Sequence, residues 1–322
     1  MDRFLAPVQR EMQSVERCLD AALKSDVAMV HEIARYMSTL QGKRLRPALA
    51  LLGAKATGCW DERIIDGAAA VEMIHAATMI HDDVVDSATM RRGKDSVNSV
   101  WSGQVAVLMG DFLLAKALGM LVDLGNLDAL GAVARATERL SQGEIFEIQI
   151  GRETDTSRES YFAMVGDKTA SLIAAACKLG PHLAGASLAS TNAMGAYGEA
   201  LGLAFQIADD VLDFTGDAST LGKPVGHDLQ EGKITLPLIM ALGEAPPAER
   251  SEIEEILGQQ QKSPEDWARV VSFVDEGGGV DAARQLALEY ADKAQACLQE
   301  LPPSAARDVL ELGVRLVVNR NS

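Results

Sequence analysis

Two long apolar stretches, each ending in a cluster of aspartates, constrain this chain more than any other feature. Residues 67–86 and 197–214 are apolar on nearly every helical face. A helix of that kind belongs at the centre of a bundle and not at its surface. The first stretch ends in the sequence HDDVVD and the second in ADDVLD. We therefore expect a fold built around two buried helices that each present acidic side chains at one end.

The remaining sequence predicts an all-α protein. Aromatic residues make up only 4% of the chain, and no Asn-Gly or Asp-Gly turn separates two alternating segments, so strand signals are nearly absent. Ala, Leu, Met, Glu and Gln dominate in blocks of helical length that Gly and Pro interrupt. No linker rich in Pro, Gly or Ser divides the chain. The sequence predicts ten or more helices in a single domain over residues 1–322.

The net charge, the cysteine pattern and the N-terminal sequence limit the partners and the cellular location that we expect for this protein. The 322 residues include 30 Lys and Arg against 46 Asp and Glu, a formal net charge of −16. Such a surface repels nucleic acid and anionic lipid, so an anionic substrate would need a local basic cluster, a metal ion or both. The four cysteines form no CxxC pair, and the N-terminus has no apolar signal core. The longest uncharged run, residues 179–198, contains a proline, an asparagine and four glycines, so we expect no transmembrane segment and a cytoplasmic location.

The spacing of the aspartates indicates a site for a hard cation. Asp82 and Asp86 lie one helical turn apart on one face. Four polar residues of the second stretch share a face by the same count: Gln206, Asp209, Asp210 and Asp213. Carboxylates packed this closely repel one another, and Mg²⁺ with substrate phosphate oxygens compensates such charge. One such motif alone is explained equally well as a solvated acidic face, but two at the ends of apolar helices favour metal binding.

Basic residues accompany both acidic clusters. They are Lys43, Arg44 and Arg46 before an apolar helix, Arg91 and Arg92 after the first cluster, Lys168 with Thr169, and Lys223 and Lys233 after the second cluster. We expect Lys168 and Thr169 to open a further apolar helix, where phosphate binds favourably. His75 precedes Asp82 by seven residues and shares nearly the same helical face, which favours a substrate contact. Each base alone is typical of a surface, but together they indicate a Mg²⁺–diphosphate site.

The ordered set of motifs resembles one enzyme family. Residues 72–93, which read EMIHAATMIHDDVVDSATMRRG, are similar to the first aspartate-rich motif of trans-polyprenyl diphosphate synthases. Residues 42–47, 168–169, 205–213 and 221–224 match the remaining motifs of that family in order. The resemblance covers roughly residues 41–237. It implies an all-α isoprenoid synthase fold, a helical bundle around a deep central cavity, and normally a homodimer.

The resemblance also implies a role for each matched residue. The isopentenyl diphosphate would be bound by Lys43, Arg46, His75 and Arg92. Mg²⁺ on the allylic diphosphate primer would be held by Asp82 and Asp86, with Asp209 or Asp210 opposite and Asp213 in the same cluster. The allylic pocket would be completed by Arg91, Lys168, Thr169, Gln206, Lys223 and Lys233. The expected reaction is Mg²⁺-dependent elongation of the allylic diphosphate by isopentenyl diphosphate, with Asp82, Asp86, Lys168, Asp209 and Lys223 as the catalytic set.

Product length is expected to depend on Ala77 and Thr78, which lie one turn ahead of the first aspartates. Short-chain members of the family carry an aromatic ring at this position, so two small residues predict a long, octaprenyl-type product, as in a quinone side chain. A farnesyl or geranylgeranyl diphosphate synthase is the alternative. A terpene cyclase would leave residues 42–47 and Arg92 without a purpose, and a noncatalytic subunit of a heteromer predicts eroded aspartates, whereas none is missing.

Overall fold

The structure is a computed structural model that describes residues 2–40, 42–153, 156–215, 226–230, 232–259 and 261–318. Most of these residues are α-helical and only two short strands occur among them, so the all-α prediction is confirmed. Contacts divide the chain into two compact units. The first unit comprises Met1–Thr137, Leu172–Gly195 and Leu298–Leu310, and the second comprises Glu138–Ser171, Ala196–Cys297 and Glu311–Ser322. The single domain expected over residues 1–322 stays a prediction, and each unit is described by itself below.

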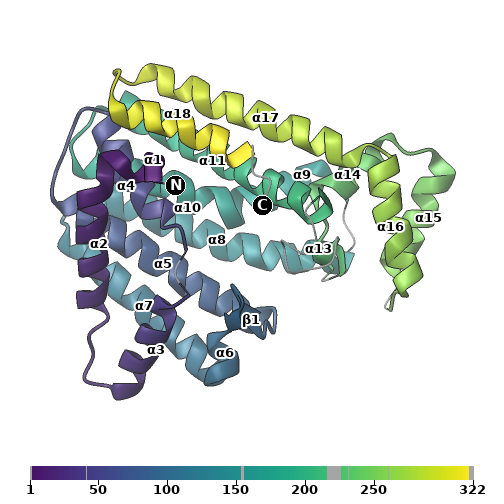
Figure 1. Cartoon of the computed structure of the whole chain (residues 1–322), viewed down its shortest axis with the longest axis horizontal. Helices are drawn as coiled ribbons and strands as arrows, with labels where there is room; N and C mark the ends of the chain where they lie inside the picture. Colours follow the sequence, from purple (N-terminus) through teal and green to yellow (C-terminus); the bar gives the residue numbers. More distant parts are fainter. Residues whose placement is uncertain are drawn as a thin grey trace. The chain divides into compact units, whose positions relative to one another are not determined.

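The first unit is built around one central helix. Its elements are α1 (Asp2–Leu5), a 3₁₀ turn (Ala6–Val8), α2 (Gln9–Ala22), α3 (Ala28–Ser38), α4 (Leu45–Ala56), α5 (Arg63–Val85), β1 (Met90–Arg91), β2 (Lys94–Asp95), α6 (Val97–Val100), α7 (Gly103–Asp123) and most of α10 (Ser171–Leu183). Helix α5 packs against α2, α4 and α7 (Figure 1). Its side chains are buried almost without interruption from Gly67 to Ile74. This is the environment that a helix apolar on every face requires.

A close approach between helices fixes α5 against α7 near the first acidic cluster. The imidazole of His81 lies where a side chain at Gly110 of α7 would stand, so this contact requires glycine. The His81 Nε2 atom lies 3.1 Å from the carbonyl oxygen of Val107, which is also on α7. His81 therefore packs against α7.

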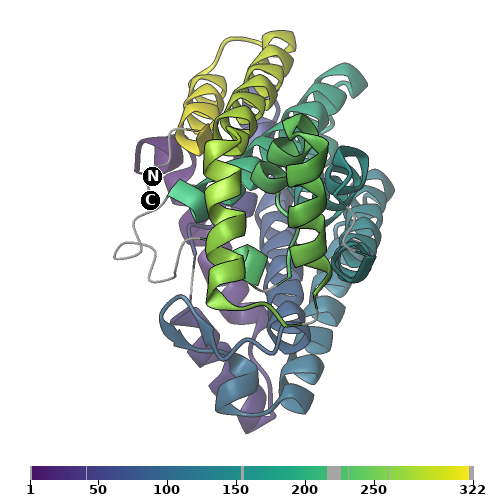
Figure 2. The same ribbon diagram turned by 90° about the vertical axis from the view of Figure 1, so that its right-hand side faces the viewer.

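The second unit surrounds the short buried helix α14. Its elements are α9 (Arg158–Val165), a π-helical turn (Gly166–Ala170), α13 (His227–Gln230), α14 (Leu236–Glu244), α15 (Pro247–Gly258), α16 (Pro264–Glu276) and α17 (Gly279–Cys297). The boundary between the units falls within α8 (Leu127–Glu153), α11 (Leu188–Thr215) and α18 (Ala305–Val318). Helix α14 packs against α9, α16 and α17. Helices α15 and α16 lie side by side in both views (Figures 1 and 2), and a capping box between Ser263 and Asp266 begins α16.

A two-stranded hairpin follows the first acidic cluster, in a region where the sequence showed no strand signal. Met90 pairs with Asp95 and Arg91 with Lys94. The two turn residues, Arg92 and Gly93, have φ values of 52° and 75°. Positive φ at both positions is what a tight two-residue hairpin turn needs. The hairpin therefore fixes the directions of Arg91 and Arg92, two of the predicted substrate ligands.

Candidate active site

The basic loop before α4 is anchored by contacts within the first unit. Lys43 is exposed, and Arg46 is partly buried. Among the described residues, Nε of Arg46 is buried without a hydrogen-bond partner. The Arg92 guanidinium lies 2.5 Å from the place of a Cβ atom on Gly42, and its Nη1 donates to the carbonyl oxygen of Leu40 at 2.7 Å. A buried unpaired guanidinium nitrogen beside a loop of cations is a suitable donor for an anionic ligand.

His75 lies in a field of positive charge. Burial lowers its pKa well below the usual value, and the charges of Arg46, Arg92, Arg91 and Arg44 lower it further. The imidazole is therefore neutral near pH 7. A neutral imidazole still has one N–H donor to offer to a phosphate oxygen. The structure thus brings together three of the four residues predicted to bind isopentenyl diphosphate, Arg46, His75 and Arg92, and Lys43 lies on the loop directly before the helix of Arg46.

The first acidic cluster divides into two environments. The amide of Asp86 donates to the carbonyl oxygen of Asp82 at 2.8 Å, so these aspartates are one helical turn apart at the end of α5. Asp82 is partly exposed and Asp86 is exposed. Asp83 is buried instead, and Arg91 Nε donates to its Oδ1 at 2.7 Å. Burial raises the pKa of Asp83, and the nearby Arg91 opposes that shift. Asp82 and Asp86 are thus more exposed than Asp83, whose carboxylate pairs with Arg91.

In the second unit a buried chain of hydrogen bonds links three predicted residues. Thr169 Oγ1 donates to Gln206 Oε1 at 3.0 Å, and Gln206 Nε2 donates to Asp210 Oδ1 at 3.0 Å. The other Asp210 oxygen accepts from the Tyr161 hydroxyl at 2.6 Å and from the Leu236 amide at 3.2 Å. Burial raises the pKa of Asp210 to about 7, although these donors work in the opposite direction. Asp210 is thus a satisfied interior carboxyl, whereas the sequence grouped it with the metal ligands.

The other aspartates of the second cluster are more accessible. Asp209 and Asp213 are partly exposed. Asp213 Oδ2 accepts from the amide of Asp228 at 3.2 Å, at the start of α13. Lys233 is partly exposed in the segment after α13. Lys223, predicted as a catalytic and substrate-binding residue, lies outside the described residues.

Lys168 occupies a different local structure from the one predicted. It lies inside the π-helical turn between α9 and α10 and does not open a helix, so that prediction is wrong. Its Nζ donates to Glu147, and lies 2.9 Å from Glu144 Oε2, both on α8. Burial lowers the pKa of Lys168, but the two carboxylates outweigh it and raise the pKa overall. The Lys168 backbone fills the space that a side chain at Gly143 would need, so the close contact with α8 requires glycine there.

Arg139 supports the same π-helical turn. Its Nε donates to Asp167 Oδ1 at 2.6 Å, and its Nη2 donates to the Gly166 carbonyl at 3.1 Å and to Glu199 at 3.0 Å. Sequence reasoning missed this group together with Glu144, Glu147 and Tyr161. The sequence did offer a signal for the contact between Lys168 and α8: a glycine, Gly143, followed by two glutamates that lie one helical turn from each other. Nothing in the sequence marked Tyr161.

The accessible carboxylates fit a magnesium ion that also binds substrate. Within the described part of the chain, no three His, Cys, Asp or Glu side chains cluster closely enough to hold a metal alone. Mg²⁺ is usually held by one or two carboxylates, several waters and substrate phosphate oxygens. Asp82 with Asp86, and Asp209 with Asp213, each supply a carboxylate pair of this kind.

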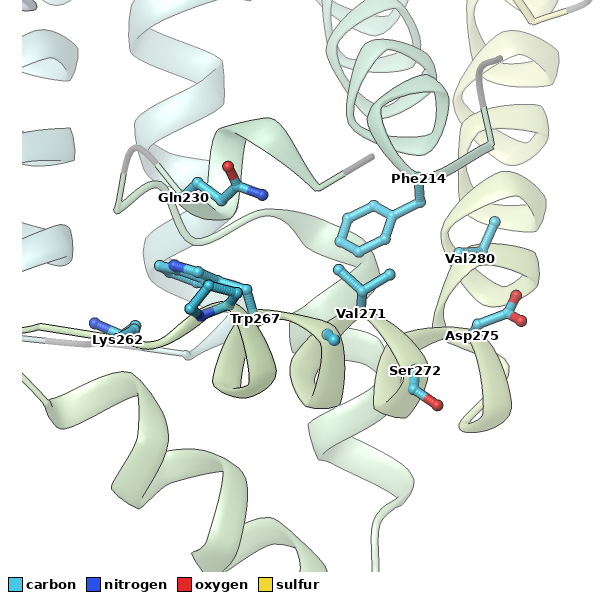
Figure 3. Close-up of a pocket in the computed structure, with 10 residues that line it drawn as sticks. Phe214, Gln230, Lys262, Trp267, Val271, Ser272, Asp275 and Val280 are labelled. Atoms are coloured by element: carbon cyan, nitrogen blue, oxygen red, sulfur yellow. The ribbon is translucent and has the colours of Figure 1, made fainter. Parts of the chain in front are cut away.

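A cavity of about 690 Å³ lies in the second unit (Figure 3). Helix α16 contributes most of the lining residues, and Figure 3 shows the ring of Phe214 extending toward Val271 of that helix. None of the described residues that line it was predicted for the active site. The cavity nevertheless adjoins the second acidic cluster, because its lining residue Phe214 directly follows Asp213.

Helix α7 carries an exposed apolar face. Its central window has a mean hydropathy of 2.0, and only 33% of that window is buried. In the described part of the chain it is the one helix long and apolar enough to cross a membrane by length and composition, a feature the sequence reading overlooked. Asp111 and Lys116 interrupt the window, and its opposite face packs against α5.

Comparisons with known proteins agree with this geometry. The polyprenyl synthetase family model matches residues 27–274. The chain belongs to the polyprenyl synthetase family. It is 36% identical to the octaprenyl diphosphate synthase of Escherichia coli over 316 residues, which covers 97% of this chain and 96% of that protein. It is also 36% identical to an all-trans-nonaprenyl-diphosphate synthase of Rhodobacter capsulatus, over 98% of this chain and 97% of that protein.

The structural comparison confirms the isoprenoid synthase fold. A polyprenyl synthase from Caulobacter crescentus, solved in complex with calcium and isoprenyl diphosphate, superposes with a TM-score of 0.92 at 38% identity and covers 100% of this chain and 98% of its own. This polyprenyl synthetase is therefore a prenyltransferase of a divalent-metal-dependent family. Other matched relatives range from a short chain isoprenyl diphosphate synthase to a heptaprenyl diphosphate synthase component 2, so family membership leaves the product length open.

Proposed function

We propose that this enzyme uses Mg²⁺ to elongate an allylic diphosphate with isopentenyl diphosphate, and that its product is a long all-trans polyprenyl diphosphate of the octaprenyl type. The observation that carries the proposal is the cation group of the first unit, where a buried, unpaired Arg46 nitrogen lies in the first turn of α4, directly after the loop that carries Lys43. Such a site has no use in an enzyme that only ionises one diphosphate. It requires a second phosphorylated substrate.

The nucleophilic substrate is bound by charge and by one neutral donor. Lys43, Arg46 and Arg92 supply charge-assisted hydrogen bonds to the diphosphate of isopentenyl diphosphate. His75 stays neutral because the surrounding arginines oppose its protonation, so it donates without adding to their mutual repulsion. Binding at several points fixes the double bond of the substrate for attack, which lowers the entropic part of the barrier.

The electrophilic substrate needs its leaving group neutralised. Mg²⁺, which Asp82 with Asp86 and Asp209 with Asp213 would hold as two carboxylate pairs, would supply positive charge to the departing diphosphate. Lys168 is held by Glu144 and Glu147, which raise its pKa, so we propose that it adds to that charge when the diphosphate takes their place at its Nζ atom. We assign Asp210 to a supporting role, because its oxygens already accept from Gln206, Tyr161 and the Leu236 amide. Thr169, Gln206, Lys223 and Lys233 remain proposed contacts of the allylic pocket. Arg91 is a further proposed contact of that pocket, and its ion pair with Asp83 fixes the position of its guanidinium.

The proposed length of the product rests on the turn of α5 ahead of Asp82. Thr78 lies one turn before Asp82 on the same face and is partly exposed, while Ala77 is only 1% exposed. The small, partly exposed side chain of Thr78 leaves room for a growing apolar tail, whereas Ala77 is closely packed. A side chain for a respiratory quinone is the use we propose for such a product, made in the cytoplasm.

A second copy of the chain is the partner that the exposed face of α7 favours. Four large apolar side chains lie on one stripe of this helix, each 38–61% exposed: Val107, Leu108, Leu118 and Val122. An apolar helix face of this kind marks a protein interface. We propose a homodimer that packs through it. A heteromer is the alternative, since one relative is named as component 2 of a heptaprenyl diphosphate synthase.

The decisive experiment is a product assay with the purified enzyme, Mg²⁺, labelled isopentenyl diphosphate and farnesyl diphosphate. Chromatography is expected to show polyprenyl diphosphates near C40. Products that end at C15 or C20 would support the short-chain alternative. Cyclic hydrocarbons would identify a cyclase, and absence of product from the chain alone would identify a heteromer subunit. Asp82→Ala serves as the inactive control, with turnover lowered on the order of a thousandfold and the fold retained.

A further inference from the structure

Arg44 lies between Lys43 and Arg46 in the sequence, but its contacts differ from theirs. Its Nε and Nη2 donate to the two carboxylate oxygens of Glu16 at 2.9 and 3.3 Å, and its Nη1 donates to Glu72 Oε1 at 2.8 Å. The Arg44 side chain is 17% exposed, and the Glu72 side chain is 8% exposed. The arginine fork thus joins α2 to α5 through the loop that precedes α4. A guanidinium committed to two carboxylates has little capacity left for a phosphate.

The backbone of Arg44 adopts a conformation that needs such support. Its φ is 50° and its ψ is 42°, in the left-handed region that residues other than glycine seldom occupy. It is also the N-cap residue of α4, and its carbonyl oxygen accepts the Ala48 amide hydrogen at 3.3 Å. A strained residue persists only where its surroundings determine its conformation. Here the ion pairs with Glu16 and Glu72 perform that function.

Glu72 is also a buried acid whose charge acts on the residues predicted to bind isopentenyl diphosphate. It precedes His75 by one turn of α5. Its charge acts on Arg46, where it opposes the lowering of the pKa by burial, and it acts in the same sense on Arg92. Among the groups identified as acting on these two arginines, Glu72 is the acidic one. Removing its charge would make the pocket more positive.

We propose that Arg44 is a positioning residue for the isopentenyl diphosphate pocket, locked between Glu16 and Glu72 so that Lys43, just before α4, and Arg46, in its first turn, are presented to the substrate. This inference rests on the proposed function, because the pocket itself is assigned there. It separates the three cations of the loop into two that bind substrate and one that binds protein.

A positioning role and a purely electrostatic role predict opposite changes in diphosphate affinity for the Glu72→Gln variant. If the loop cations acted only through their summed charge, Glu72→Gln would raise the positive potential and tighten the binding of a diphosphate. If Arg44 positions the loop, the same substitution releases one arm of the fork and weakens binding. Arg44→Lys gives an independent comparison, because lysine keeps the charge but cannot join both carboxylates in the geometry of the fork.

The test is steady-state kinetics of the full-length enzyme with each substrate varied in turn. We expect Glu72→Gln and Arg44→Lys each to raise KM for isopentenyl diphosphate about tenfold, with KM for the allylic primer unchanged within about twofold. Glu11→Gln is the matched control. It breaks another ion pair between α2 and α4, with Lys55 at 2.6 Å, but at the far end of α4 from the basic loop. A lowered or unchanged KM for isopentenyl diphosphate in Glu72→Gln would overturn the proposal.

Two further measurements keep the outcome interpretable. Thermal unfolding verifies that each variant folds, and if Glu72→Gln does not, Glu16→Gln tests the more exposed arm of the same fork with the same expectation. A wild-type enzyme that fails to consume isopentenyl diphosphate would refute the proposed function itself. Equal increases in KM for both substrates would leave that function intact and refute the positioning role alone.

Discussion

Tyr161 and Asp210 form a buried pair in the second unit, with the tyrosine hydroxyl donating to Asp210 Oδ2 at 2.6 Å. Asp210 is therefore buried, whereas Asp209, its neighbour in the sequence, remains partly exposed. Burial and the Asp210 carboxyl raise the pKa of Tyr161 well above its ordinary value, so the phenol stays a donor. The two adjacent aspartates of this motif therefore differ in environment: Asp210 is hydrogen-bonded in the interior, and Asp209 faces solvent in part.

This arrangement predicts a stability defect for Asp210→Ala. The substitution leaves the Tyr161 hydroxyl and the Leu236 amide without their buried acceptor, which is expected to lower the free energy of unfolding by about 3 kcal/mol. Asp210→Asn retains the shape and one acceptor oxygen and should cost less than half as much. Urea unfolding without metal measures both. Equal stability of the alanine variant and the wild type would show that Asp210 is not a structural residue.

Gly42→Ala is predicted to impair substrate binding through Arg92. The added methyl group would stand 2.5 Å from the guanidinium nitrogen Nη2, so the arginine side chain must move. Loss of one charge-assisted contact is expected to raise KM for isopentenyl diphosphate about tenfold while KM for the primer stays constant. Gly258→Ala is the matched control, since no atom lies within 4 Å of its added methyl group. Unchanged kinetics in Gly42→Ala would show that Arg92 moves aside without consequence.

The pH dependence of stability should reveal the lowered pKa of His75. Near pH 6 and below, the unfolded chain binds a proton at this histidine and the folded chain does not, so the free energy of unfolding falls as the pH falls. This group alone accounts for about 1 kcal/mol at most between pH 7 and 5.5. Urea unfolding of the wild type and His75→Gln at both pH values measures the difference. A loss of stability as large in the variant as in the wild type would contradict the neutral imidazole.

Sequence periodicity predicted the helices of this fold better than the partners of individual side chains. Apolar residues on nearly every face predicted that α5 lies at the centre of the first unit. The spacing of one helical turn predicted that Asp82 and Asp86 lie together. Both predictions depend only on spacing along one helix. The burial of Asp83 and Asp210 depends on Arg91 in a hairpin and on Tyr161, 49 residues away. No local pattern encodes a contact between elements, so the two repeats of the motif looked alike in the sequence.

The exposed stripe of α7 predicts the effect of a charge on assembly. Leu118→Lys places a cation at the proposed interface and should convert a dimer to a monomer. Leu188→Lys is the control, since Leu188 is 71% exposed at the start of α11 and lies outside the stripe. Analytical ultracentrifugation of both variants and the wild type measures the mass. A wild-type monomer, or a dimer that survives Leu118→Lys, would place the partner surface elsewhere.

The turn of α5 before the first acidic cluster makes the sharpest prediction about the product. Thr78 lies on the Asp82 face, is partly exposed, and donates its hydroxyl hydrogen to the His75 carbonyl at 2.9 Å. Thr78→Phe should place a ring in the path of the growing tail and shorten the product toward C15–C20, with the first condensation retained. Ala77→Phe differs, because Ala77 is only 1% exposed and its neighbours are packed. A ring at that position must displace the neighbouring side chains, at a cost of about 1–3 kcal/mol in stability. Product chromatography and thermal unfolding of both variants separate a blocked path from a strained helix pair. If Thr78→Phe still yields the long product of the wild type, the tail does not pass this turn, and the residues that set its length must be sought on another helix.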